Sequence, residues 1–220
     1  MSAQLATVRP LQSSIVRTSG AATVFIVDAD ASSRAWLEHA LQARGVRVES
    51  FDSAEQFLAQ PRGANTSCLI VDTDGLALQQ ALADCPEIPV VFVTSQRDVM
   101  LTVRAMKAGA IDFLVKPCSE TAILDAVDTA LDRSRSVLAQ EAVRRGLEGR
   151  YELLSPRERE VMALIVSGRL NKQVGAQLGI SEITVKVHRG NVMRKMAADS
   201  FAQLVMMGRS LRLDPLQALA

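Results

Sequence analysis

The chain is 220 residues long, 48% hydrophobic and only 4% aromatic, which suits one large domain or two small ones with largely aliphatic cores. Apolar runs such as residues 88–93 are far shorter than the roughly 20 residues that a membrane helix needs, which excludes a transmembrane protein. The net charge of +1 conceals an acidic front and a basic back, because residues 1–130 hold ten basic and fifteen acidic side chains whereas residues 155–220 hold ten and five. We therefore expect two modules, the second of which has a polyanionic partner.

Residues 1–22 are expected to form a flexible polar lead-in, since they lack the unbroken apolar segment of a secretory signal peptide. Three cysteines, Cys68, Cys85 and Cys118, are too few and too odd in number for a disulfide framework. A reducing cytoplasm is therefore the expected location.

From residue 23 onward, short β-branched runs alternate with stretches of helical periodicity. The predicted strands are residues 23–28, 46–50, 67–72, 89–94 and 111–115, and the predicted helices are residues 31–43, 53–60, 76–83, 98–108 and 119–133. Residues 24–27 and 69–71 are wholly apolar, which indicates a parallel sheet that helices cover on both faces. The expected fold class is α/β, with a five-stranded doubly wound parallel sheet over residues 23–133.

Polar residues stand at the carboxyl ends of these strands, where doubly wound sheets bind their ligands. They are Asp28 and Asp30 after the first strand, Asp72 after the third, Thr94 in the fourth and Lys116 after the fifth. Carboxylates from two strands suit Mg²⁺, which prefers hard oxygen ligands. Asp72 is then placed to attack a phosphoryl group, Lys116 to neutralise the developing charge, and Thr94 to bond the product phosphate.

Over residues 23–133 this arrangement resembles the receiver domain of two-component response regulators. Lys116-Pro117 follows the fifth strand as in that family, and residues 105–113 look like its FixJ branch. A sensor histidine kinase is the implied phosphoryl source. The resemblance implies one phosphoacceptor and three switch residues, which are Asp72 and then Thr94, Phe113 and Lys116.

The pocket departs from the family pattern beside the first strand. Receivers normally carry two adjacent acids there, and the second of them binds Mg²⁺ directly. This chain has Ala29 at that position, between Asp28 and Asp30. The loss of one carboxylate is expected to weaken metal binding.

A second departure is the short loop after Asp72, where only Thr73 and Asp74 precede Gly75. A backbone carbonyl of this loop binds the metal in the family, and Asp74 offers a carboxylate in its place. We expect a weakened Mg²⁺ site made of Asp28, Asp30 and Asp74. We hypothesise that phosphotransfer to Asp72 is weak or absent, and the alternative to phosphorylation control is a regulator controlled by a partner or a ligand.

Residues 134–153 are charged and rich in arginine, and they predict a helical linker that either supports pairing or is a solvated helix. Four short helices are expected over residues 154–220. Their starts are marked by a capping box, Ser155-Pro-Arg-Glu158, and by capping residues at Asn171, Ser181 and Ser200. Two helices joined by a three-residue turn, here the second and third, form the layout of a helix-turn-helix.

The third of these helices, over residues 181–196, separates into two faces at 100° per residue. Its core-facing residues are Val185, His188, Val192 and Met196, and its outer residues include Lys186, Val187, Gly190, Asn191 and Arg194. His188 is interpreted as a packed histidine. An outer face that is thin and partly basic can enter a DNA major groove.

Three stretches resemble the LuxR/NarL-type DNA-binding domain, and most of all its FixJ branch: Leu154-Ser-Pro-Arg-Glu-Arg-Glu-Val161, Asn171-Lys-Gln173 and Ile180-Ser-Glu-Ile-Thr-Val-Lys-Val-His-Arg-Gly190. The resemblance implies base contacts from Lys186 and Val187. It implies phosphate or near-backbone contacts from Asn171, Lys172, Thr184, Arg194 and Lys195. It places a dimer seam in or beside Phe201, Leu204, Val205 and Gly208 of the fourth helix. The expected partners are double-stranded DNA, a second copy of the chain and RNA polymerase.

Three other functions remain open at this point, although we expect no enzymatic activity. Val71-Asp-Thr-Asp-Gly-Leu76 mimics the opening motif of haloacid-dehalogenase-type phosphatases, but there the motif follows the first strand rather than the third. Cys118 follows a basic residue and offers a redox site, against which a simple packing role is favoured. A receiver fold that only sequesters a partner is disfavoured by the complete recognition helix.

Overall fold

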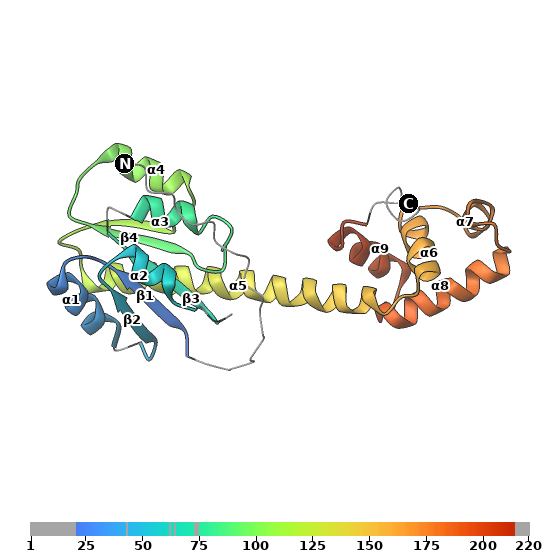
Figure 1. The fold of residues 1–220 in the computed structure, drawn as a ribbon, viewed down its shortest axis with the longest axis horizontal. Helices are drawn as coiled ribbons and strands as arrows, with labels where there is room; N and C mark the ends of the chain where they lie inside the picture. Colours follow the sequence, from blue (N-terminus) through green and yellow to red (C-terminus); the bar gives the residue numbers. More distant parts are fainter. Residues whose placement is uncertain (1–20, 43, 62, 64, 73–74, 214–220) are drawn as a thin grey trace. The chain divides into compact units, whose positions relative to one another are not determined.

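The computed structural model describes residues 21–42, 44–61, 63, 65–72 and 75–213 (Figure 1). Contacts divide the chain into one unit up to Ala139 and a second unit from Gln140 onward, so the division falls inside the predicted linker. Each unit has a hydrophobic core of its own. Within the described part of the chain, no helix combines the length and the apolar character that a membrane crossing requires.

The first unit contains a sheet of five parallel strands, which confirms the predicted fold class. The order across the sheet is β2-β1-β3-β4-β5. The chain therefore adds β2 on one side of β1 and then β3, β4 and β5 on the other side. Every residue of β1, β3 and β4 is buried, as the wholly apolar runs predicted. The strands are β1 Thr23–Val27, β2 Arg47–Phe51, β3 Ser67–Val71, β4 Val90–Thr94 and β5 Asp112–Val115.

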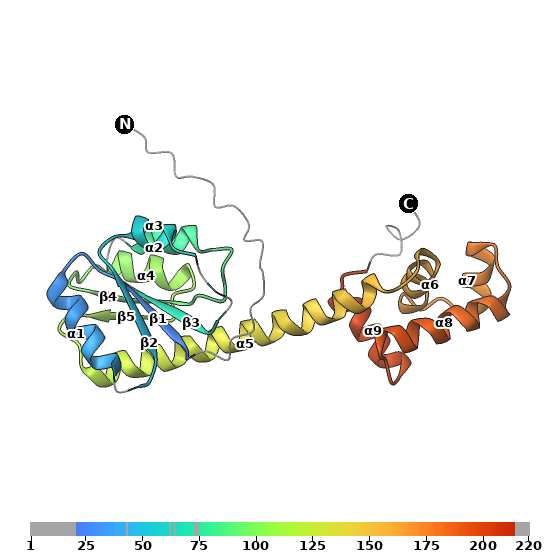
Figure 2. The same ribbon diagram turned by 60° about the horizontal axis from the view of Figure 1, so that its bottom comes forward.

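Helices cover both faces of the sheet (Figure 2). One face packs against α1 (Ala31–Gln42) and the first part of α5 (Glu120–Glu152). The other face packs against α2 (Ala54–Ala59), α3 (Gly75–Ala81) and α4 (Val99–Lys107). The sheet edge that carries the carboxyl ends of the strands is therefore held in place by a core on each side.

The helix α3 begins at Gly75, soon after the end of β3. A Cβ at this position would lie 1.9 Å from Cγ2 of Val71, so only glycine lets the helix start this close to the strand. The Gly75 N–H also donates to the backbone oxygen of Asp72 at 2.9 Å. Gly75 thus allows α3 to start close to the end of β3.

A buried serine joins α5 to the opposite edge of the sheet. The hydroxyl of Ser134 is fully buried, accepts from the N–H of Ser67 at 3.0 Å, and donates to the carbonyl of Glu87 at 2.7 Å. Buried backbone groups need such partners, so this hydroxyl satisfies one donor and one acceptor at once.

Residues 119–133 and the predicted linker fall largely within one helix, α5, which runs without a break from Glu120 to Glu152. The sequence over this range contains no proline, which would have interrupted the helical hydrogen bonds.

The second unit contains α6 (Pro156–Val166), α7 (Asn171–Leu178), α8 (Glu182–Met196) and α9 (Phe201–Ser210). The capping box of Ser155 with Glu158 is confirmed, as are the caps of α8 and α9 at Ser181 and Ser200. The predicted cap at Asn171 is wrong, because the helix is capped one residue earlier. Gln173 Oε1 accepts from the N–H of Leu170 at 2.9 Å, which leaves Asn171 as the first residue of α7.

The turn between α7 and α8 depends on close backbone contact. A Cβ at Gly175 would lie 2.7 Å from the backbone oxygen of Ile180, so a larger residue would push α7 away from the turn. The tight packing fixes the two helices of the helix-turn-helix against each other.

Candidate functional site

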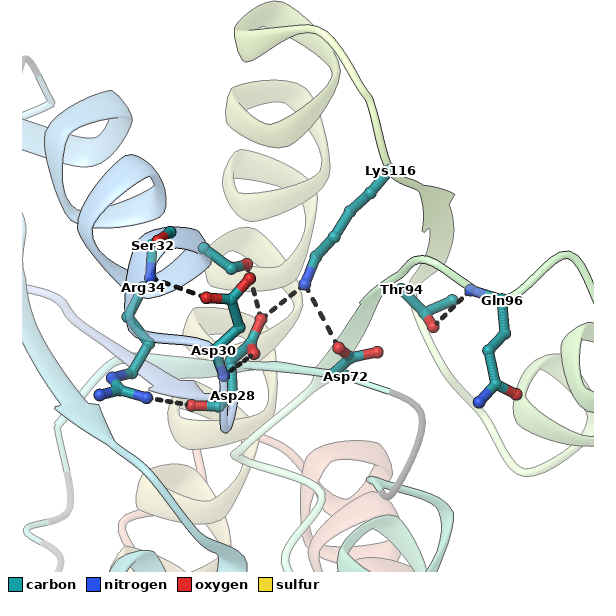
Figure 3. A network of polar contacts seen from close by, with 9 residues as sticks. Asp28, Asp30, Ser32, Arg34, Asp72, Thr94, Gln96 and Lys116 are labelled. Atoms are coloured by element: carbon teal, nitrogen blue, oxygen red, sulfur yellow. Dashed lines mark hydrogen bonds and ion pairs between the residues drawn. The ribbon is translucent and has the colours of Figure 1, made fainter.

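Three charged side chains from three strands meet at the carboxyl edge of the sheet (Figure 3). Asp28 follows β1, Asp72 follows β3 and Lys116 follows β5. The Lys116 Nζ lies 2.6 Å from Oδ2 of Asp28 and 3.3 Å from Oδ2 of Asp72. The structure therefore brings together the three residues to which the sequence assigned metal binding, phosphoryl acceptance and charge neutralisation.

Asp28 is the enclosed member of this cluster, with a side chain that is only 4% exposed. Its Oδ1 accepts from the N–H of Asp30 at 2.8 Å, and its Oδ2 accepts from the hydroxyl of Ser33 at 2.6 Å as well as from Lys116. A buried carboxylate is tolerated where charge-assisted hydrogen bonds replace its water.

Lys116 keeps its positive charge in this setting. Burial lowers the pKa of its ammonium, but hydrogen bonds and charge from Asp28 and then Asp72 raise it by more, so the pKa lies above its ordinary value. The lysine is thus a fixed cation between two carboxylates.

Asp72 is the open member of the cluster, with 29% of its side chain exposed. On the next strand across the sheet, Thr94 is fully buried, and its Oγ1 accepts from the N–H of Gln96 at 3.1 Å. An incoming group can reach Asp72 from solvent while Thr94 and Lys116 border its position (Figure 3).

Asp30, a second predicted metal ligand, is not added to this cluster. Asp30 is exposed, and its Oδ1 accepts from the N–H of Ser32 at 2.9 Å at the start of α1. Asp74 lies outside the described residues, and Ala29 supplies no carboxylate. Among the described residues, no group of three or more His, Cys, Asp or Glu side chains is arranged to hold a metal.

The two carboxylates of this cluster still fit a weakly bound Mg²⁺ ion. This ion is commonly held by one or two carboxylates together with waters and phosphate oxygens. Asp28 and Asp72 are the two carboxylates at hand, although Lys116 already bridges them.

Two further residues of this unit, Phe113 and Cys118, were given roles from the sequence. The ring of Phe113 stacks on that of Phe92, with centroids 5.8 Å apart, and packs against the core beneath α2, α3 and α4. Burial raises the pKa of the Cys118 thiol more than its own backbone hydrogen bond and the charge of Lys116 lower it. A raised pKa disfavours the thiolate that redox chemistry needs.

In the second unit, α8 has one buried face and one exposed face. Val185, Val192 and Met196 are fully buried, as predicted, and His188 is half-buried. On the outer face, the side chain of Lys186 is 62% exposed and lies 3.2 Å from Glu182, and Val187 is 60% exposed.

An arginine that the sequence analysis did not single out links three helices of this unit. Arg189 Nη1 donates to Oδ1 of Asn171 at 3.3 Å, and its guanidinium lies 4.4 Å from the centre of the Phe201 ring. A planar cation stacked on an aromatic ring is held in a defined orientation. Arg189 thus fixes the side chain at the start of α7, next to exposed Lys172.

The remaining predicted DNA contacts have mixed surroundings. The Thr184 hydroxyl lies 2.8 Å from that of Ser181 in the cap of α8. Arg194 is exposed and donates to Asn191 at 3.2 Å. The Lys195 Nζ instead lies 2.6 Å from Glu158 Oε2, inside an ion pair of its own unit.

The residues of the predicted dimer seam on α9 have different surroundings within their own unit. Leu204 is fully buried in the core of its own unit, and a Cβ at Gly208 would lie 3.1 Å from Val166, so Gly208 faces the end of α6. Phe201 is 37% exposed and carries Arg189, whereas the neighbouring Met206 is 61% exposed. The apolar stripe that the sequence shows is therefore mostly an internal packing surface.

Ile183 is a second exposed residue of this unit with no role predicted from the sequence. It is 75% exposed in the first turn of α8. Its position nine residues before Val192 was the available signal, because nine residues make two and a half helical turns of about 3.6 residues each.

Comparisons with known proteins match both units. A family model described as "Response regulator receiver domain" matches residues 24–128, and one described as "Bacterial regulatory proteins, luxR family" matches residues 152–208.

Whole-chain relatives show the same pairing of units. The chain is similar to nodulation protein W of Bradyrhizobium diazoefficiens, with 43% identity over 86% of each chain. It is 38% identical to the transcriptional regulatory protein FixJ of Rhizobium meliloti, over 84% of this chain and 94% of that one. The solved structure of the response regulator StyR is 41% identical and has a TM-score of 0.74, over 86% of this chain and 99% of that one.

Proposed function

Because this chain belongs to the two-component response regulators with a LuxR-type DNA-binding domain, we propose that its receiver unit controls how two copies pair and bind DNA. Asp72 is the residue that accepts the controlling phosphoryl group, and its phosphorylation is inefficient. The single observation that carries this proposal is the contact of Lys116 with both Asp28 and Asp72 beside an accessible Asp72 side chain.

The proposed step transfers a phosphoryl group to an oxygen of Asp72. The bond from phosphorus to the leaving group of the donor breaks, which is a P–N bond in a phosphohistidine and a P–O bond in acetyl phosphate, and a new P–O bond to the Asp72 carboxylate forms. Lys116 offsets the negative charge on the transferred group, and Thr94 offers its hydroxyl to a phosphoryl oxygen. A Mg²⁺ ion held by Asp28 and Asp72 would supply further neutralisation of the phosphoryl oxygens.

Phosphoryl transfer is slow for two reasons. Ala29 supplies no carboxylate, and the remaining carboxylates already accept hydrogen bonds within the protein. Asp28 already accepts from three donors, and Asp30 is used at the start of α1. Fewer free oxygen ligands lower the affinity for Mg²⁺ and therefore the rate of transfer.

The pairing surface of the receiver unit is proposed to include α4. This helix exposes an unusual apolar group, which comprises Val99 at 75%, Met100 at 69%, Val103 at 40% and Met106 at 44%. Exposed apolar patches of this kind mark association surfaces. A second copy of the chain is the occupant, because two DNA-binding units on a pseudo-palindromic site require a symmetric pair.

The DNA-binding units then occupy half-sites about one helical turn apart. Lys186 and Val187 face the bases, while Lys172, Asn171 and Arg194 face the phosphates. A sensor histidine kinase and RNA polymerase are the proposed protein partners, and the cytoplasm, where the DNA lies, is the proposed location.

One sample tests the proposal through its oligomeric state and its affinity for a duplex selected from a random library. Both are measured with and without acetyl phosphate, or beryllofluoride, in the presence of Mg²⁺. Because acceptance is weak, we expect a partial shift toward the dimer with tighter DNA binding, and a mass gain of one phosphate on part of the sample that Asp72→Ala abolishes. DNA binding without any response to either reagent would favour control by a partner or a ligand and would overturn the role of Asp72.

A further inference from the structure

The recognition helix α8 carries an isoleucine on the side directly opposite its buried face. Ile183 is 75% exposed, whereas Val192, nine residues later, is fully buried. Nine residues turn an α-helix through about 900°, or two and a half turns, so the two side chains point in opposite directions. Ile183 thus points away from the core of its own unit, in the first turn of α8.

The surface around Ile183 is a narrow apolar strip with a cation beside it. Val187 is one turn further along on the same side and is 60% exposed, and Lys186 beside it is 62% exposed. A Cβ built at Gly190, in the next turn, meets no described atom within 4 Å. The helix is therefore thin at this point, which permits close approach of its backbone to a partner.

A DNA major groove fits this strip better than a protein surface does. Residues 155–220 carry ten basic against five acidic side chains, and a polyanion complements that balance. Within the major groove the C5-methyl group of thymine is the apolar feature that distinguishes it from other bases. An exposed branched aliphatic side chain at the leading end of the helix is a matching contact.

We propose that Ile183 is a specificity-determining residue that contacts the C5-methyl group of one thymine in each half-site. This inference rests on the proposed function of α8 in reading DNA and adds a base type and a residue to it. Ile183 and Val187 lie four residues apart, a rise of about 6 Å along the helix. Because base pairs are stacked about 3.4 Å apart, the two side chains reach different base pairs.

The test replaces single thymines by deoxyuridine, which removes only the methyl group. The full-length chain first selects a duplex from a random library, and each thymine of that duplex is then replaced in turn. We expect one thymine per half-site at which wild-type affinity falls about fourfold, and a fall of about fifteenfold when both half-sites are changed. In Ile183→Ala the penalty at that thymine disappears, and Ile183→Val keeps part of it.

Two control variants separate this contact from its neighbours. Val187→Ala leaves the penalty at the Ile183 thymine intact, because it acts at another base pair. Val143→Ala, which truncates a 65% exposed valine on α5, leaves the whole profile unchanged. If the full-length chain selected no preferred sequence from the library, the proposed function itself would be wrong. Selection of a preferred sequence with no uracil penalty, or with a penalty that persists in Ile183→Ala, would sink only the assignment of Ile183.

Discussion

The ammonium nitrogen of Lys195 lies 2.6 Å from Oε2 of Glu158, whose side chain is only 6% exposed. The same oxygen accepts from the N–H of Ser155 at 2.8 Å, and Lys195 also donates to the carbonyl of Leu153 at 3.1 Å. The end of the recognition helix α8 is thereby tied to the start of α6. We therefore predict that Lys195 supports DNA binding by holding α8 in position, in addition to the near-backbone contact that the family resemblance implied.

Replacement of Glu158 by glutamine is expected to destabilise the second unit in a pH-dependent way. Burial raises the pKa of Glu158, but hydrogen bonds and charge from Lys195 and the N–H of Ser155 lower it by more, so the pKa lies below its ordinary value. A carboxylate with a lowered pKa adds stability above its unfolded pKa of about 4.3 and loses that stability as the pH falls through the folded value. We expect Glu158→Gln to lower the free energy of unfolding by about 2 kcal/mol at neutral pH.

Urea unfolding at a series of pH values measures this difference. The gap between wild type and Glu158→Gln should narrow as the pH falls below about 4. Glu160→Gln is the matched control, because Glu160 pairs with Arg157 at 2.6 Å in a more exposed position and should change stability by less than about 1 kcal/mol. A gap that stays constant with pH would show that the charge of Glu158 is not what stabilises the unit.

Two lysines of the DNA-binding unit are expected to act differently on affinity. Lys186→Ala should cost about 1–3 kcal/mol at one base position and relax the preference there. Lys172→Ala should weaken binding to all sequences and reduce the slope of affinity against salt by about one unit. Titrations of the selected duplex and of single-base variants at several salt concentrations distinguish the two. Identical behaviour of both variants on every sequence would remove Lys186 from the base-reading surface.

The stacking of Arg189 on Phe201 is expected to support DNA affinity through Asn171. Phe201→Leu keeps an apolar side chain but removes the ring on which the Arg189 guanidinium stacks. Arg189 is then no longer oriented to donate its hydrogen bond to Asn171. We expect affinity for the selected duplex to fall about threefold to tenfold, with an unchanged base preference. Phe201→Tyr should retain affinity, since its ring still carries the guanidinium. A loss of affinity equal in Phe201→Leu and Phe201→Tyr would contradict a role for the stacked pair.

Truncations on α9 should separate internal packing from pairing between copies. Leu204→Ala removes a fully buried side chain and is expected to cost about 2–5 kcal/mol in the free energy of unfolding. Met206→Ala removes a side chain that is 61% exposed and should leave the folding of the unit nearly unchanged. Thermal unfolding and sedimentation of the full chain measure the two effects. If Leu204→Ala altered only the dimer population, its assignment to the core would be wrong.

The strands and the acidic pocket could be predicted from the sequence because their signals are local. A wholly apolar run such as residues 24–27 requires burial on both faces, and Asp28 directly after it must then emerge at the edge of the sheet. Asp72 and Lys116 follow in the same way from the ends of their own strands. Because the strands are parallel, their carboxyl ends lie at one edge of the sheet, so these three residues are expected to lie close together.

The surroundings of Leu204, Lys195 and Asp30 depend on partners that a local pattern cannot identify. The apolar period of α9 shows that one face of the helix is buried, but not whether α6 or a second copy buries Leu204. The ion pair of Lys195 joins residues that lie 37 positions apart. Asp30 precedes α1, where a carboxylate serves as a helix cap as readily as a metal ligand.

The hydroxyl of Ser134 has a consequence for how a signal can travel through the receiver unit. It fastens α5 at the amino edge of the sheet, while β5 and Lys116 lead into the same helix from the carboxyl edge. A helix secured at both edges resists sliding along its axis. On the opposite face, α4 is held at its last turn by the amide of Gln79, which donates to Ala105 at 3.2 Å, and its first turns are largely exposed. We therefore expect α4 to shift more readily than α5 when the carboxyl edge of the sheet rearranges.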